Sequence, residues 1–351
     1  MAGYLLKRLL LMIPTLFGVM VVTFIVIQFV PGGPVEQLIS QMQRHNAAGE
    51  AGGGAGVPLY RGDSGLDTER IEKLKALYGF DKPVHQRFFD MVVNYAKFDL
   101  GESYFHHQSV LDLVISKLPV SISLGMWTFF IVYLTSVPLG IAKAARDGSR
   151  FDISTTTIIL IGYAIPGFVL GITLLVLFGG GSFWSVFPLR GLVSDDWDTL
   201  PWYGQVGDYL WHITLPVIAS VVGSFAMVTM LTKNSFVEEI RKQYVLTARA
   251  KGLPQNTVLY KHVFRNAMIP LVTGFPVAFM GAFFASSLLI ETIFSLDGLG
   301  LLSYESVMKR DYPVILGTLY LFTLLGLVAK ILSDLCYVLI DPRIKFDAVD
   351  S

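Results

Sequence analysis

The sequence is poor in charge and in cysteine, and both shortages narrow the class of protein. Only 15% of its 351 residues are charged, whereas a soluble domain carries about 25%. Lysine plus arginine equals aspartate plus glutamate, with 27 of each, so no excess of positive charge indicates a nucleic-acid partner. The single cysteine, Cys336, excludes a disulfide within the chain and any CxxC metal or redox site.

Motifs for nucleotide and metal chemistry are missing as well. The sequence contains no GxxxxGK[ST] segment and no HExxH, so nothing predicts a phosphate-binding loop or a zinc-protease site. The adjacent His106 and His107 point to different sides of a helix or strand, and we interpret them as a solvated pair. No residue set typical of an intramembrane enzyme is visible. We therefore expect no catalytic residue, no metal and no cofactor on this chain.

What the sequence does contain is long apolar runs. Hydrophobic residues make up 53% of it, and a helix needs about 20 such residues to cross a bilayer. Several runs carry internal glycine or proline, which membrane helices tolerate. We predict an all-α polytopic membrane protein with six transmembrane helices. The six runs are 9–30, 120–142, 153–177, 213–231, 268–293 and 314–340.

The first run is too long for the apolar core of a signal peptide, and no A-x-A cleavage site follows it. We therefore interpret it as a retained helix. With the N-terminus inside, the inner segments carry fourteen lysines and arginines and the two short outer loops carry three. This bias predicts that both termini are cytoplasmic.

Residues 31–118 separate the first two runs by a long outer segment. Five glycines between positions 49 and 56 predict disorder over 40–64. Apolar residues at helical spacing then predict helices over 67–78 and 84–96, followed by a turn at 99–101. The segment could be a mere connector, but two amphipathic helices favour a small structured insert. The predicted parts are 1–30, with the tip and the first transmembrane helix; 31–118, the insert; 119–342, a five-helix core; and 343–351, a cytoplasmic tail.

The loop 233–265, between the fourth and fifth runs, is the most informative segment. It has about 33 residues and seven basic groups, and so long a loop in a compact bundle is usually functional. Gly252 is expected to end a first helix in the left-handed conformation, and Pro254 prevents its continuation. A second helix is predicted over 255–266.

Two interpretations of this loop remain. It could anchor the inner face to anionic lipid through its basic groups, or it could be a docking element. Small residues spaced Ala-x-Ala-x-Gly would let another surface approach closely, and this favours docking. The residues expected to take part are Tyr244, Thr247, Ala248, Arg249, Ala250, Lys251, Gly252 and Leu253.

Three charged residues in or near the membrane runs need explanation. Lys330 and Asp334 are four residues apart, so they can neutralise each other on one helix face. We favour this structural pairing over a contact with a transported molecule, although an intramembrane charge is by default a functional candidate. Glu291 lies at the end of the fifth run, where it could face the entrance of a pathway or lie among headgroups, and the sequence favours neither position.

Nearly the whole chain resembles the inner-membrane permease family of dipeptide and oligopeptide ABC importers. Tyr244 to Leu253 is similar to that family's EAA loop, although Leu246 stands where the general motif has glutamate. The chain departs from the family again where Leu296 and Asp297 replace Trp-Pro. Further similar segments are Tyr4 to Leu9, Pro31 with Gly32, LYGFDKP at 77–83, DLGES at 99–103, ETIF at 291–294, GLG at 298–300 and Asp341 to Arg343.

This resemblance implies a type I ABC importer permease fold in a bacterial inner membrane, with residues 31–118 as a periplasmic insert. It implies that loop 233–265 couples this chain to a separate ATPase, which holds ATP and Mg. The other implied partners are a second homologous permease, a periplasmic binding protein, and an oligopeptide or microcin C-like peptide as substrate. The alternatives are a secondary transporter or channel, which would need coupling-ion sites near the midplane, and an intramembrane enzyme.

Overall fold

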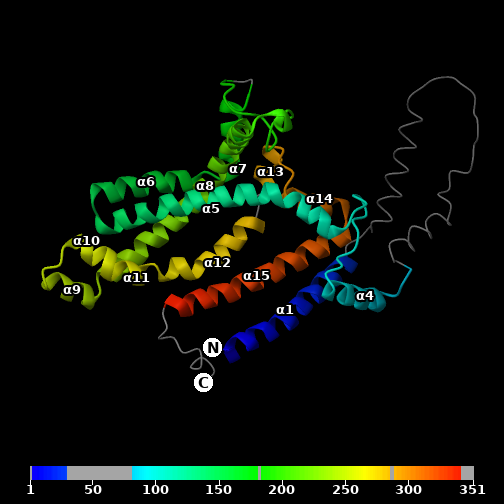
Figure 1. The fold of residues 1–351 in the computed structure, drawn as a ribbon, viewed down its shortest axis with the longest axis horizontal. Helices are drawn as coiled ribbons and strands as arrows, with labels where there is room; N and C mark the ends of the chain where they lie inside the picture. The colour runs from blue at the N-terminus through cyan, green and yellow to red at the C-terminus, as the bar shows by residue number, and fades with distance from the viewer. Residues whose placement is uncertain (1, 30–80, 181–182, 285–287, 341–351) are drawn as a thin grey trace, which may run out of the picture. The chain divides into compact units, whose positions relative to one another are not determined.

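The computed structural model describes residues 2–29, 81–180, 183–284 and 288–340 (Figure 1). Every regular element in these ranges is helical, and strand pairing there is limited to two isolated bridges. The prediction of an all-α chain is therefore confirmed. The glycine-rich stretch 40–64 and the helix expected over 67–78 lie outside the described residues.

The helices follow the apolar pattern closely, and the helix predicted over 84–96 forms with these bounds. The elements are α1 (Ala2–Phe29), α4 (Val84–Ala96), α5 (Val110–Ala145), α6 (Arg150–Ala164), α7 (Gly167–Phe178), a 3-10 turn (Trp197–Thr199), α8 (Trp202–Ile240), α9 (Gln243–Ala250), α10 (Gln255–Thr257), a π-helical turn (Val258–Val263), α11 (Phe264–Ala267), α12 (Ile269–Phe284), α13 (Leu288–Ile293), α14 (Leu299–Lys309) and α15 (Tyr312–Ile340).

Four described helices are long and apolar enough to cross a bilayer, namely α1, α5, α8 and α15. Two bent pairs bring the number to six if each pair is one span. The third apolar run is not the continuous helix that its length predicts, because α6 and α7 meet at an angle of 86°. Pro166 causes the break, since a proline disfavours helical geometry at the preceding residue, and Ile165 is accordingly extended. The second pair, 255–267 with 269–282, bends by 51°.

The chain divides into two compact units. The first contains residues 1–8, 117–302 and 325–351. Within it α8 packs against α6, α7, α12 and α13. Small residues allow close approach of the helices: a Cβ on Gly140 of α5 would lie 2.5 Å from the Thr232 Cβ of α8, and one on Gly167 of α7 would lie 2.9 Å from the Ala219 carbonyl oxygen.

The second unit contains residues 9–116 and 303–324. Helix α4 packs on α1 through Phe88 and Phe24, whose ring centroids are 5.2 Å apart. The segment after α4 is held by a buried carboxylate: Asp311 accepts hydrogen bonds from the Ser103 hydroxyl at 2.5 Å and from the Tyr104 amide at 3.1 Å. The insert therefore has ordered structure over its described part. The division of the chain at residues 30, 118 and 342 follows the expected membrane topology and stays a prediction.

The contact between α5 and α8 leads to a test of the packing. Gly140→Ala places a methyl group against Thr232, and such overpacking costs about 1–3 kcal/mol. We expect a lower unfolding temperature for the purified protein in detergent. Gly326→Ala on α15 is the matched control, because a Cβ there meets nothing within 4 Å. Equal unfolding temperatures for the two variants would contradict the close approach of α5 and α8.

Candidate functional site

Helix α9 lies directly after α8 and has one buried and one exposed side. Val245 and Ala248 are buried in a cluster with Ile141 and Ala144 of α5 and Phe236 of α8. The opposite side is exposed and includes apolar surface at Leu246, whose exposed fraction is 51%. The exposed residues of this segment are Leu246, Thr247, Arg249, Ala250, Lys251, Gly252 and Leu253.

Two of the residues expected in a docking surface are not exposed. The Ala248 side chain faces the core of the protein, so its small size serves the packing of α9 on α5 rather than the approach of another surface. Tyr244 is half-buried. Sequence reasoning took the spacing of small residues as one face, but positions 248 and 250 point to different sides of a helix.

A polar network holds α9 at the end of α8. The Tyr244 hydroxyl donates to the Glu239 carboxylate at 2.6 Å, and the Asn266 amide donates to the same oxygen at 3.1 Å. Lys242 forms an ion pair with Glu239 at 2.5 Å. Burial of the phenol and its bond to Glu239 raise the pKa of Tyr244 to about 12, so this residue keeps its proton at neutral pH and positions the helix.

The end of α9 agrees with the prediction from its sequence. Gly252 has φ +79°, and its amide donates to the Arg249 carbonyl at 2.9 Å. Glycine adopts this conformation without the steric cost of a Cβ. The second helix, expected over 255–266, is present as α10, a π-helical turn and α11 in succession. The π-helical turn was not foreseen, because no residue type marks one.

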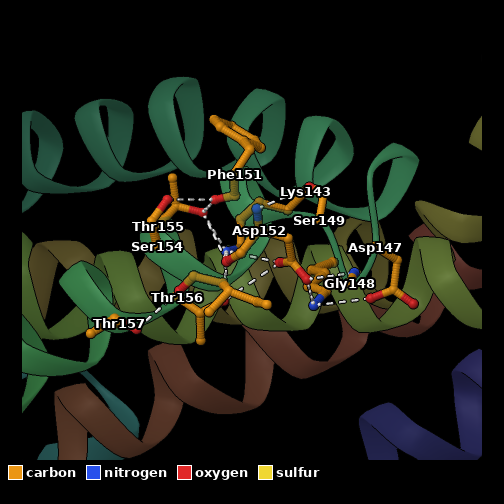
Figure 2. Close-up of polar contacts among 12 residues, drawn as sticks. Lys143, Asp147, Gly148, Ser149, Phe151, Asp152, Ser154, Thr155, Thr156 and Thr157 are labelled. Atoms are coloured by element: carbon orange, nitrogen blue, oxygen red, sulfur yellow. Dashed lines mark hydrogen bonds and ion pairs between the residues drawn. The ribbon is translucent and has the colours of Figure 1, made fainter.

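A cluster of buried charges joins the turn between α5 and α6 to α8 (Figure 2). The Lys143 side chain is fully buried, and its ammonium donates to the Thr155 and Thr156 hydroxyls, both at 2.7 Å. It also pairs with the Asp152 carboxylate at 3.1 Å, and Lys233 of α8 pairs with Asp152 at 2.6 Å.

The turn between α5 and α6 forms a second set of ion pairs near the end of α8, through Asp147. Asp147 pairs with Lys233 at 3.2 Å and with Arg241 at 3.3 Å. Ser149 caps α6 by accepting a hydrogen bond from the Asp152 amide at 3.2 Å. Sequence reasoning counted the lysines of this cluster as part of the positive-inside bias and missed their pairing. Serine followed three residues later by aspartate was a signal for the start of α6, but it does not indicate which lysines meet Asp152.

A cavity of about 700 Å³ lies among α5, α6, α7, α8, α12 and α13. None of the described residues that line it carries a formal charge. Its walls combine apolar groups with hydroxyls, among them Thr128, whose buried oxygen has no hydrogen-bond partner within the described residues. Phe129 and Tyr133 contribute two neighbouring rings from α5, tilted by 30° and with centroids 4.5 Å apart. The chamber is suited to a guest that forms few specific ionic contacts.

Glu291 occupies neither of the positions considered from the sequence. Its side chain is fully buried, where it accepts a hydrogen bond from the Leu301 amide at 2.6 Å. Ser121 donates to the same carboxylate at 3.3 Å and accepts from the Leu299 amide at 2.9 Å. Glu291 thus caps the N-terminus of α14. Gly298 leaves room for it, because a Cβ there would lie 2.2 Å from the carboxylate oxygen.

The expected pair of Lys330 with Asp334 is wrong. Asp334 instead pairs with Arg8 of α1, at 3.2 Å. Lys330 is exposed, and it has no ion pair in the part of the chain that the structure describes. The four-residue spacing allows the contact, but the side chain of Asp334 is directed to a different helix.

Comparison with known proteins decides the family. Residues 136–346 match the model of the binding-protein-dependent transport system inner membrane component. The chain belongs to this family. It is 56% identical over the whole of both chains to the Peptidoglycan transport system permease protein YejB of Agrobacterium fabrum, and 54% identical, over 99% of this chain and 100% of its relative, to the Inner membrane ABC transporter permease protein YejB of Escherichia coli O157:H7. The Di/tripeptide transport system permease protein DppB of Pseudomonas aeruginosa is 31% identical over 98% of this chain and 99% of its own.

Positions 296 and 297, where the sequence departs from the expected Trp-Pro, form local contacts. Leu296 is buried, with an exposed fraction of 1%, and its amide donates to the Glu291 carbonyl at 2.8 Å. Asp297 forms an ion pair with Lys117 of α5. Ser295 takes a positive φ of 51°. The turn before α14 is therefore closed by a packed leucine and an ion pair.

The buried cluster at the α5–α6 turn predicts that removing Lys143 destabilises the protein much more than removing Arg241. Lys143→Met leaves the hydroxyls of Thr155 and Thr156 without their donor and Asp152 with one cation fewer, and removing one partner of a buried pair costs about 3 kcal/mol. We expect earlier unfolding of the purified protein when detergent micelles are titrated with SDS. Arg241→Ala is the control, because this exposed partner of Asp147 stabilises by about 0–1 kcal/mol. Similar losses from both variants would argue against the buried role of Lys143.

Proposed function

We propose that this chain is a permease subunit of an ATP-driven peptide importer, forming half of a translocation pathway. The proposal rests on the way in which α9 is attached to the rest of the protein. Its buried side and the Glu239 network attach it to α5 and α8, while Leu246 and the residues around it stay exposed. A helix so attached can transmit the displacement of a bound partner to the core. The peptide permeases among the relatives supply the substrate class.

The proposed topology counts each bent helix pair as one span, which gives six spans in the bacterial inner membrane. Both termini then lie in the cytoplasm, and the segment 31–118 lies in the periplasm. Loop 233–265 lies on the cytoplasmic side, where an ATPase subunit can reach it. The positive-inside distribution of lysine and arginine supports this orientation.

In the proposed mechanism, ATP and Mg bind to a separate ATPase and not to this chain. Closure of the ATPase dimer displaces α9 and shifts the core between outward-open and inward-open states, because the two states differ in their contacts with the ATPase. Thr247, Arg249, Ala250, Lys251, Gly252 and Leu253 form the contact surface, with Leu246 added to the residues expected from the sequence. Tyr244 and Ala248 hold the helix in place.

The proposed partners are a second homologous permease, ATPase subunits and a periplasmic peptide-binding protein. The uncharged cavity supports an oligopeptide substrate of varied sequence, because its walls favour no particular side-chain charge. Peptides released from the cell wall and microcin C-like peptides both belong to this class, and the name of the Agrobacterium relative supports the former.

The proposal is tested by isolating the chain from its membrane with a mild detergent and identifying the co-purifying proteins by mass spectrometry. We expect a second permease and subunits that carry a phosphate-binding lysine motif. The complex, reconstituted in vesicles with its binding protein, should import peptide with ATP after ion gradients are collapsed. A chain that purifies alone and transports with an ion gradient would overturn the proposal in favour of a secondary transporter.

The contact surface has its own test in Gly252→Asn. Asparagine tolerates the left-handed conformation, and a Cβ at this position meets nothing within 4 Å in this chain. The added side chain therefore obstructs a partner and not the fold. We expect peptide import per ATP hydrolysed to fall by about tenfold, as loss of one important interface contact predicts.

Gly148→Asn is the matched control, since Gly148 also has a positive φ, of 75°, and open surroundings. It lies on the α5–α6 turn and outside the proposed contact surface. Normal coupling in the Gly252 variant, or an equal loss in both variants, would contradict docking at α9.

A further inference from the structure

An open cleft of about 640 Å³ lies between α12 and the part of α15 that belongs to the first unit. Thr273, Val277 and Ala278 line it from α12, and Lys330 and Ser333 line it from α15. A hydrogen bond from the Ser333 hydroxyl to the Thr273 carbonyl joins the two helices. Lys330 is therefore a cation in a cleft between two apolar helices.

The other polar groups of the cleft already have partners. The Thr273 hydroxyl donates to the Ile269 carbonyl at 2.8 Å, and Ser333 donates to Thr273. Asp334 pairs with Arg8 at 3.2 Å. Among the described groups that line the cleft, the Lys330 ammonium is the donor that no hydrogen bond or ion pair engages.

Lys330 lies in a part of α15 where an ammonium without a partner is energetically unfavourable. It lies ten residues before Ile340, which corresponds to about 15 Å along a helix. A lysine so far from the end of an apolar helix is unfavourable unless an anion accompanies it or it reaches water. An anion that binds Lys330 transiently would offset this unfavourable free energy only while it is bound.

The cleft adjoins the large cavity. Ala278 of α12 lines both, and none of the described residues that line the large cavity carries a formal charge. A molecule in the cavity therefore has Lys330 as the cation next to its chamber. Every linear peptide with a free C-terminus carries one carboxylate, whatever its sequence, and an ammonium binds a carboxylate through charge-assisted hydrogen bonds.

We propose that Lys330 binds the C-terminal carboxylate of the peptide during its passage. This inference rests on the proposed peptide transport and adds one contact to it. A single cation that engages the main-chain terminus lets the protein retain peptides of varied sequence in a chamber that is otherwise neutral.

The test compares two forms of one peptide, with a free C-terminal carboxylate and with a C-terminal amide, in the reconstituted complex. Lys330→Gln should lower the initial import rate of the carboxylate form by about tenfold, the value of one hydrogen bond to a charged group. The rate for the amide form should stay at its wild-type value. Lys330→Arg should retain the preference, and Lys309→Gln, at an exposed pair with Glu305, is the control.

A second measurement does not depend on delivery of the amide. Lys330→Cys is made together with Cys336→Ser, and the new thiol is modified with an aminoethyl or a sulfonatoethyl thiosulfonate. The aminoethyl group restores the positive charge and should restore import of the carboxylate peptide, whereas the sulfonate should not.

An equal loss for both peptides in Lys330→Gln would overturn the proposal and assign the ammonium to a lipid phosphate or to a carboxylate of the second permease. Unchanged import of the carboxylate form, or rescue by both reagents, would also overturn it. A wild-type complex that imports neither peptide with ATP would refute the proposed function instead.

Discussion

The buried ammonium of Lys143 is the constraint on which the packing of α5, α6 and α8 in the first unit depends. A lysine without exposed surface is tolerated only when its charge and its three donors are satisfied, and here Asp152, Thr155 and Thr156 satisfy them. These partners lie on α6, and Asp152 in turn binds Lys233 of α8. One residue thus sets the relative positions of three helices. The neighbouring residues Ile141 and Ala144 are part of the apolar cluster against which α9 packs.

The residues of α12 that line the chamber and the cleft follow one stripe along the helix and carry no charge. The chamber has aromatic rings and hydroxyls on its other walls, whereas the cleft contains Lys330 of α15. Two further charged side chains of the described parts serve the structure: Glu291 caps α14, and Asp334 pairs with Arg8.

Much of the architecture was predictable because it depends on local rules. Apolar runs of sufficient length indicated the helices, the spacing in 84–96 predicted α4, and Gly252 marked the end of α9. The 86° bend between α6 and α7 was not predicted, although Pro166 was its signal, since membrane helices often tolerate proline. The docking surface stays a prediction, and the structure changes its expected residues: Ala248 packs inward, because burial depends on what α5 and α8 present to α9.

The sequence by itself determined the class of the protein: a helical membrane chain without a nucleotide-binding motif, with an exposed loop that resembles the coupling segment of peptide permeases. Hydrophobic length, loop charge and turn residues act over a few positions, so they can be read along the chain. Only the tertiary structure decided which charges meet. Lys143 and Lys233 are 90 residues apart yet share Asp152, while Lys330 and Asp334 are one helical turn apart and do not pair. Ion pairing depends on the directions of side chains from several helices, and no spacing along one helix contains that information.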